Sequence, residues 1–224
     1  MKENIYDTRY RMLDAGYCLK YQESRIEYRA SSIKYLISFS SDLTILNSIT
    51  PLPLNSNDPA FPNTAYIALG SNKGDRLDFL KKAVNEIEKE NSCKVISVSS
   101  VYETKPFGNV NQENFYNCAA KIDTSNSLLD FFHLLKNIEG KLGREKTIKW
   151  GPREIDLDLL FFNNEIYSSD EIKVPHEGIP NRDFVLVPLC EIAPELIHPE
   201  LNLKICDICT TEKNIIKKLK KQIF

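Results

Sequence analysis

Segments of two different periodicities alternate between residues 65 and 163, and this alternation limits the folds that the chain can adopt. In two of the segments apolar residues recur every three or four positions, as on one face of a helix. The other segments are rich in β-branched and aromatic residues, which favour strands. The helical segments are residues 74–90 and 127–143, and the strand segments are residues 65–70, 93–104, 114–124 and 154–163. The order β-α-β-β-α-β predicts an α+β fold with a ferredoxin-like core, in which helices pack on an antiparallel sheet.

The helical segments carry signals for their ends. Asp75 stands near the start of the first segment, where a side chain that accepts from the backbone is favoured. Gly143 closes the second segment, and glycine is the usual residue just past the end of a helix. Residues 93–104 alternate aliphatic and serine side chains, so we expect one continuous strand there.

A stretch rich in proline and asparagine, residues 50–64, separates two parts of different composition. Proline fixes φ and removes a donor, and asparagine favours turns, so this stretch is expected to be a linker. We therefore divide the chain into an N-terminal extension with its linker, a catalytic domain and a basic tail, which are residues 1–62, 63–205 and 206–224. The tail is expected to be helical, as a solvated surface helix rather than a membrane or partner helix. The role of residues 1–60 stays open between a remnant of another domain, a partner-docking segment and an arm without fixed structure.

Composition excludes some classes of partner. The formal net charge is −2, so there is no basic field for nucleic acid. No apolar run approaches the roughly 20 residues of a membrane span, and the N-terminus lacks the apolar core of a secretory signal. Six scattered cysteines, with a lone C-x-x-C at residues 206–209, fit a reducing cytoplasmic setting better than a disulfide framework or a zinc site.

Two aspartates interrupt the last strand segment. Side chains at i and i+2 of a strand point to the same face, so Asp156 and Asp158 are expected to project together. Ile155, Leu157 and Leu159 then face a core. Neighbouring carboxylates repel unless a positive group lies between them, and Mg²⁺ is often held by one or two carboxylates plus substrate phosphates. From spacing alone, Mg²⁺ binding by these aspartates is no better supported than the alternative, in which one aspartate pairs with an arginine and the other is solvated.

The residues before the aspartates are basic. Arg144, Lys146, Lys149 and Arg153 lie within ten residues of one another. Guanidinium groups bind phosphate oxygens with two parallel hydrogen bonds, so this segment next to a carboxylate pair indicates a polyphosphate site. Without the aspartates, an ordinary solvated loop would explain the same residues.

Six blocks of this chain resemble a known family. They are "YIALGSN" (66–72), "ETKPFG" (103–108), "NFYNCA" (114–119), "KWGPREIDLDLL" (149–160), "VPH" (174–176) and "NRDFVLVPLCEIAPE" (181–195). In order and spacing they are similar to the 6-hydroxymethyl-7,8-dihydropterin pyrophosphokinases of folate biosynthesis. The resemblance covers about three-fifths of the chain and does not reach residues 1–60.

The resemblance implies transfer of pyrophosphate from ATP to the hydroxymethyl group of the pterin, with AMP as the second product. It implies that Asp156 and Asp158 hold two Mg²⁺ ions and that Arg144 and Arg153 contact the phosphates. The positions that it assigns to ATP are Glu139, Trp150, His176 and Arg182. Those that it assigns to the pterin are Asn117, the backbone around Thr104 and Phe107, and the two rings of Phe115 and Phe184, which would sandwich the heterocycle.

The sequence departs from the family pattern at Lys105, Phe115, Lys149 and Glu177, which bears on loop behaviour and affinity more than on the reaction. Two other functions stay open. One is a different Mg²⁺-dependent phosphotransferase or nucleotide hydrolase that uses the same acids. The other is a binding module that has kept the fold without turnover.

Overall fold

The computed structural model describes residues 58–107, 112–144, 151–208, 214–219 and 223–224, together with the backbone of two short strands, β1 (Tyr10–Met12) and β2 (Cys18–Lys20). The chain divides into two compact units, Met1–Leu52 and Pro53–Phe224. In the first unit β1 and β2 pair antiparallel. The second unit contains the core that the sequence predicts.

A six-stranded antiparallel sheet forms the centre of the second unit. Its strands are β3 (Asn63–Ser71), β4 (Cys93–Val98), β5 (Tyr102–Thr104), β6 (Phe115–Thr124), β7 (Asp156–Phe162) and β12 (Ile215–Lys218). Their order is β12-β5-β6-β3-β7, and β4 also pairs with β6. The short elements outside this sheet are β8 (Tyr167–Ser168), β9 (Lys173–Val174), η2 (Ile179–Asn181), β10 (Ile197–His198), β11 (Leu203–Lys204) and η3 (Ile205–Asp207).

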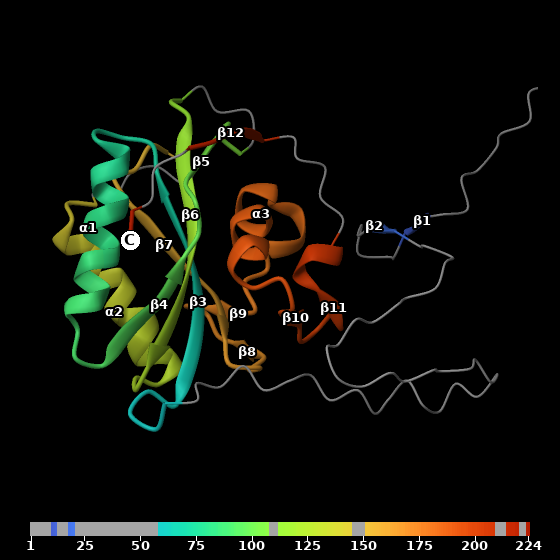
Figure 1. The fold of residues 1–224 in the computed structure, drawn as a ribbon, viewed down its shortest axis with the longest axis horizontal. Helices are drawn as coiled ribbons and strands as arrows, with labels where there is room; N and C mark the ends of the chain where they lie inside the picture. Colours follow the sequence, from blue (N-terminus) through green and yellow to red (C-terminus); the bar gives the residue numbers. More distant parts are fainter. Residues whose placement is uncertain are drawn as a thin grey trace, which may run out of the picture. The chain divides into compact units, whose positions relative to one another are not determined.

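Helices cover both faces of the sheet (Figure 1). The helices α1 (Arg76–Lys89) and α2 (Leu128–Lys141) lie on one face, and α3 (Asp183–Ile192) lies on the other. Each face has its own apolar core, because alternate residues of the strands point to opposite sides. The α+β prediction, with helices packed on an antiparallel sheet, is confirmed.

The ends of the helices follow the local signals. Asp75 caps α1, its side chain accepting from the amide of Asp78 (3.1 Å). Ser127 caps α2 in the same way, accepting from the amide of Asp130 (3.3 Å). Gly143 follows α2 with a φ of 86°, in the left-handed region that glycine adopts without a steric penalty. This turn directs the chain from α2 toward the site.

The single strand predicted for residues 93–104 is wrong, because the structure divides it into β4 and β5. The break lies at Ser99. Its hydroxyl accepts from the amide of Ala119 (2.9 Å), while its own amide donates to the carbonyl of Ala119 (2.9 Å). A side chain thus replaces one backbone acceptor of the ladder, which serine is able to do.

The helix predicted for the C-terminal tail is also wrong. Residues 215–218 form β12, which pairs antiparallel with β5. Two adjacent β-branched residues, Ile215 and Ile216, suit a strand, and they pair with backbone groups at the edge of β5, where an unpaired strand edge can accept a further strand. Ile205 and Ile208 pack in the core under α3, and Ile223 packs in the core under α1 and α2. The C-terminal segment therefore belongs to the domain.

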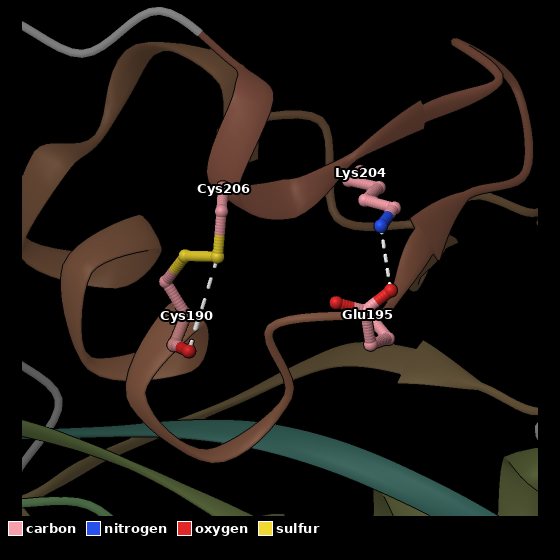
Figure 2. Close-up of a disulfide and its surroundings, with 4 residues drawn as sticks. All are labelled: Cys190, Glu195, Lys204 and Cys206. Atoms are coloured by element: carbon pink, nitrogen blue, oxygen red, sulfur yellow. Dashed lines mark hydrogen bonds and ion pairs between the residues drawn. A yellow bond between two sulfur atoms is a disulfide. The ribbon is translucent and has the colours of Figure 1, made fainter. Parts of the chain in front are cut away.

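A disulfide joins Cys190 of α3 to Cys206 of η3, with their Cα atoms 5.4 Å apart (Figure 2). Beside it, the ammonium of Lys204 forms an ion pair with Glu195 at 2.5 Å. From the sequence we expected reduced cysteines, so the disulfide differs from that prediction. The chain folds back after α3 and brings Cys190 and Cys206 together. Cys93 and Cys118 are free and buried. No helix in the described part of the chain has the length and apolar character to cross a membrane.

Candidate active site

Pairing across three strands sets the floor of the site. Gly70 of β3 lies opposite Asn117 of β6 on one side and Asp156 of β7 on the other. Ala68, two residues earlier on β3, lies opposite Asp158. Along β7 the aspartates are partly exposed and Leu157 is buried, so the predicted alternation of a carboxylate face and a core face is confirmed.

One pocket opens on the face of the sheet that carries α3. It is lined from β3, β5, β6, β7 and the start of α3, together with the loops that follow β5 and precede β7. It brings together most of the site residues that the sequence predicts. They are Thr104, Phe107, Phe115, Asn117 and Phe184 from the aromatic and amide set, and Arg153, Asp156, Asp158 and Arg182 from the charged set.

Cations flank both carboxylates at the charged end. Asp156 pairs with Arg144 through Oδ1 (2.8 Å) and with Arg153 through Oδ2 (2.5 Å). Asp158 lies 3.9 Å from the Arg182 guanidinium and 4.0 Å from Nε2 of His176. The positive groups offset the repulsion between the two carboxylates and leave Asp158 the more open of the pair.

One predicted residue, Glu139, acts from the opposite side of β7. Glu139 of α2 is buried, accepts from the amide of Leu157 (2.6 Å) and from Lys136 (3.0 Å), and forms an ion pair with Arg144. Burial raises the pKa of the Glu139 carboxyl, and Lys136, the Leu157 amide and Arg144 oppose that shift. Glu139 therefore holds Arg144, which reaches Asp156, and does not itself line the pocket. The predicted Trp150 lies outside the described residues.

His176 is oriented by the turn that follows it. Its Nδ1 accepts from the amide of Gly178 (2.9 Å), so the neutral ring carries its proton on Nε2, toward Asp158. Burial lowers the pKa of His176, and Asp158 opposes the shift. Gly178 also leaves room for Arg182, since a Cβ at this position would lie 2.6 Å from the guanidinium carbon.

The other end of the pocket presents an amide and aromatic rings. The Asn117 side chain donates to the hydroxyl of Thr104 (2.7 Å), which fixes the amide. The rings of Phe107 and Phe184 meet edge to face, with centroids 5.9 Å apart. The Arg182 guanidinium lies 5.8 Å and 6.0 Å from these two rings, within the range of a cation–π contact. Arg182 therefore lies where the charged end and the aromatic end meet.

Asn72 is a site-shaping residue that the sequence interpretation missed. It is 3% exposed. Its side-chain oxygen accepts from the backbone amide of Arg153 (2.8 Å), and its backbone amide donates to the carbonyl of Arg153 (3.1 Å). Its side-chain NH2 group also donates to the carbonyl of Glu113 (3.2 Å). Its only local signal is an amide placed directly after a strand, at the end of "GSN".

This arrangement defines a class of protein, the α+β proteins whose ligand pocket joins a charged, anion-binding end to an aromatic end that holds a flat ring. The family model described as 7,8-dihydro-6-hydroxymethylpterin-pyrophosphokinase matches residues 66–194. The chain belongs to this family.

Known proteins agree with this assignment. A Bacillus subtilis 2-amino-4-hydroxy-6-hydroxymethyldihydropteridine pyrophosphokinase is 44% identical over 134 residues, which cover 60% of this chain and 80% of that protein. A folic acid synthesis protein of Dictyostelium discoideum is 39% identical over 149 residues, and the match covers 66% of this chain but only 22% of that longer protein. The fold matches that of wild-type HPPK-DHPS from Plasmodium falciparum, with a TM-score of 0.52, 20% identity, and coverage of 64% of this chain and 42% of that one.

Proposed function

We propose that this chain transfers pyrophosphate from ATP to 6-hydroxymethyl-7,8-dihydropterin, giving AMP and the pterin diphosphate, a step of folate biosynthesis. The observation that carries the proposal is that one pocket, in a chain of this family, holds both kinds of binding group on neighbouring strands. Asn117 and Asp156 are the two residues opposite Gly70, so the ring-binding end and the phosphate-binding end share the strand between them.

The aromatic end is assigned to the pterin. Phe115 and Phe184 line the pocket and offer faces on which a flat heterocycle stacks, each contact contributing about 1 kcal/mol beyond burial. The amide of Asn117, held by Thr104, has a free carbonyl oxygen that can read a donor on the edge of the ring. The backbone near Thr104 and Phe107 supplies further polar groups along that edge.

The donor set at the charged end fits Mg²⁺. Asp156 and Asp158 offer hard carboxylate oxygens on one face, and the described residues contain no group of three or more side chains that would hold a metal by themselves. Mg²⁺ commonly takes one or two carboxylates and completes its shell with water and substrate phosphate oxygens. We assign two Mg²⁺ ions to this pair. Bound there with ATP, they would neutralise charge on the transferring group.

The arginines are assigned to the ATP phosphates. Arg144, Arg153 and Arg182 already face the carboxylates, so a polyphosphate entering this end meets guanidinium groups on more than one side. Phosphoryl transfer depends mainly on alignment and charge neutralisation. The pterin hydroxyl oxygen attacks the β-phosphorus in line, the bond from this phosphorus to the oxygen that bridges to AMP breaks, AMP leaves, and the hydroxyl proton is released to water. Asp156 accepts from two arginines in this structure, so a role as general base would need one of them to turn toward the phosphates.

The strand order supports the finer description of the fold. Leaving out β5 and β12, the sheet runs β7-β3-β6-β4, with α1 following β3 and α2 following β6. We propose that this is a ferredoxin-like βαββαβ core to which β5 and β12 are added. Residues 1–62 are proposed to be an extension outside the catalytic domain.

AMP formation tests the proposal. The full chain is incubated with ATP, Mg²⁺ and 6-hydroxymethyl-7,8-dihydropterin, and AMP and the pterin diphosphate are quantified by chromatography. We expect equal amounts of the two products, and a loss of at least about 100-fold in rate for Asp158→Asn. The matched control is Asp170→Asn, the same change at an exposed residue away from the pocket.

Two outcomes would reject the proposal. Release of phosphate from ATP without the pterin would favour a hydrolase that uses the same acids. Binding of ATP and the pterin without turnover, measured by calorimetry, would favour a binding module. Undiminished turnover by Asp158→Asn would remove the assigned metal role while leaving the reaction in place.

A further inference from the structure

Asn214, just before β12, joins two walls of the pocket. Its side-chain amide donates to Oδ1 of Asp183 (2.7 Å), and its backbone amide donates to Oδ2 of the same carboxylate (2.7 Å). Its carbonyl oxygen accepts from the amide of Lys105 (2.8 Å). One residue thus links the first residue of α3 to the segment that follows β5.

Both linked segments line the site. Asp183 stands between Arg182 and Phe184, and both of those side chains line the pocket. Lys105 lines it as well, two residues before Phe107. The Phe107 and Phe184 rings are in contact across the gap that Asn214 bridges. A shift of either segment would therefore change the distance between the surfaces assigned to the pterin.

Asp183 depends on these bonds. It is 3% exposed, and its carboxylate accepts from the backbone and side-chain amides of Asn214 and from the amide of Phe184 (2.9 Å). A buried carboxylate needs such donors, because burial without them disfavours its charged form. Loss of the Asn214 side chain removes one of the three donors and loosens the first turn of α3.

The strand β12 itself, which follows Asn214, contacts the same two parts of the fold. The strand pairs with β5, and the ammonium of Lys218 lies 3.2 Å from Glu191 of α3. Glu191 also accepts from the hydroxyls of Ser100 (2.8 Å) and Tyr102 (2.8 Å), so α3 and the β5 region meet a second time at this carboxylate. Asn214 therefore lies directly before a strand that contacts both β5 and α3.

We propose that Asn214 is a positioning residue that sets the pterin end of the pocket by fixing the Lys105–Phe107 segment against the start of α3. The proposal rests on the proposed pyrophosphokinase function. Asn214 lies beyond residues 66–194, the part that matches the family, so the C-terminal segment of this chain completes a site whose other residues lie inside that match.

The test compares steady-state kinetics of four variants. For Asn214→Ala we expect the KM for the pterin to rise about tenfold, with the KM for ATP and kcat changing less than threefold. Asn214→Asp places a carboxylate against that of Asp183, so we expect a larger rise. The exchanged pair Asp183→Asn with Asn214→Asp restores one donor and one acceptor and should recover part of the loss. Asn85→Ala, at an exposed position of α1, is the control and should match the unmodified chain.

A second measurement separates this proposal from the proposed function. Amide hydrogen exchange of the full chain without substrates should show faster exchange at Lys105 and Phe184 in Asn214→Ala, and unchanged exchange in β3. If the unmodified chain forms no pterin diphosphate, the proposed function fails, and the exchange result alone decides the positioning role. Equal changes in both KM values, no change in either, or no recovery in the exchanged pair would overturn the proposal.

Discussion

Replacing Gly70 by alanine tests how the floor of the pocket controls the pterin end. A Cβ at this position would lie 2.7 Å from Oδ1 of Asn117 and 3.8 Å from Cδ1 of Phe115. The first distance is too short, so the Asn117 amide has to turn or β3 has to move. Turning the amide breaks its 2.7 Å hydrogen bond to Thr104. The substitution therefore acts on the group that we assign to the edge of the pterin.

The size of the effect follows from these contacts. The lost hydrogen bond costs about 1 kcal/mol, and overpacking costs about 1–3 kcal/mol, at the lower end here because a side-chain end gives way. The alanine restricts the unfolded chain, which returns about 0.4–1 kcal/mol. We expect the free energy of unfolding to fall by about 1–2 kcal/mol. A loss of about 1.4 kcal/mol in pterin binding would raise its KM about tenfold.

The assay combines initial rates at varied pterin and ATP with urea unfolding. Gly140→Ala is the matched control, because a Cβ there meets no atom within 4 Å and the residue lies in α2. That variant should be more stable by about 0.8–1 kcal/mol, with both KM values unchanged. In an Asn117→Ala background the Gly70→Ala change should lose most of its effect on KM, since the crowded amide is gone.

Three results would contradict this reasoning. The first is an unchanged pterin KM in Gly70→Ala. The second is an equal rise in the KM for ATP, which would indicate a general distortion of β3. The third is an effect of the same size in the Asn117→Ala background, which would show that the two residues do not interact through the contact given above.

Three further predictions follow from buried polar side chains. Burial lowers the pKa of His198 from 6.5 to about 4, so the unfolded chain binds this proton more tightly, and the free energy of unfolding should fall by about 3 kcal/mol between pH 6.5 and pH 4. His198→Asn should show a smaller fall over the same window in urea titrations, and an identical fall would refute the assignment. Glu139→Ala leaves the buried Leu157 amide without its acceptor and removes one of the partners of Lys136 and of Arg144, so it should lower the free energy of unfolding by about 2 kcal/mol, against no change for an exposed glutamate such as Glu165. Asn72→Ala should raise the KM for ATP about tenfold with little change in the KM for the pterin, and the reverse pattern would contradict its role beside the phosphate end.

The parts of the fold that the sequence predicted are those set by local signals. The Asp75 cap of α1 acts within three residues, Gly143 lies directly after the C-cap of α2, and the alternation along β7 acts within two. The carboxylate face at Asp156 and Asp158 was predictable for the same reason, since a strand with one apolar face fixes where its other side chains point.

The parts that the sequence did not predict depend on distant partners. The tail was predicted to be an amphipathic helix, yet residues 215–218 within it form a strand because they pair with β5, more than a hundred residues earlier. Ser99 breaks a strand because its hydroxyl meets the Ala119 amide of another strand. The bonds of Asn72 to the Arg153 backbone likewise join segments whose proximity no local pattern gives. Contacts of this kind can be predicted only when the pairing and register of the strands are known.

Because β3 lies between β6 and β7, the backbone of the sheet sets the distance between the two ends of the pocket. Adjacent strands lie about 4.8 Å apart, so Asn117 and Asp156, on either side of Gly70, are held about 10 Å apart by main-chain hydrogen bonds. From the proposed function we therefore expect that a pterin whose hydroxyl sits on a longer arm than one methylene exceeds this span and is a poor substrate, even when its ring binds.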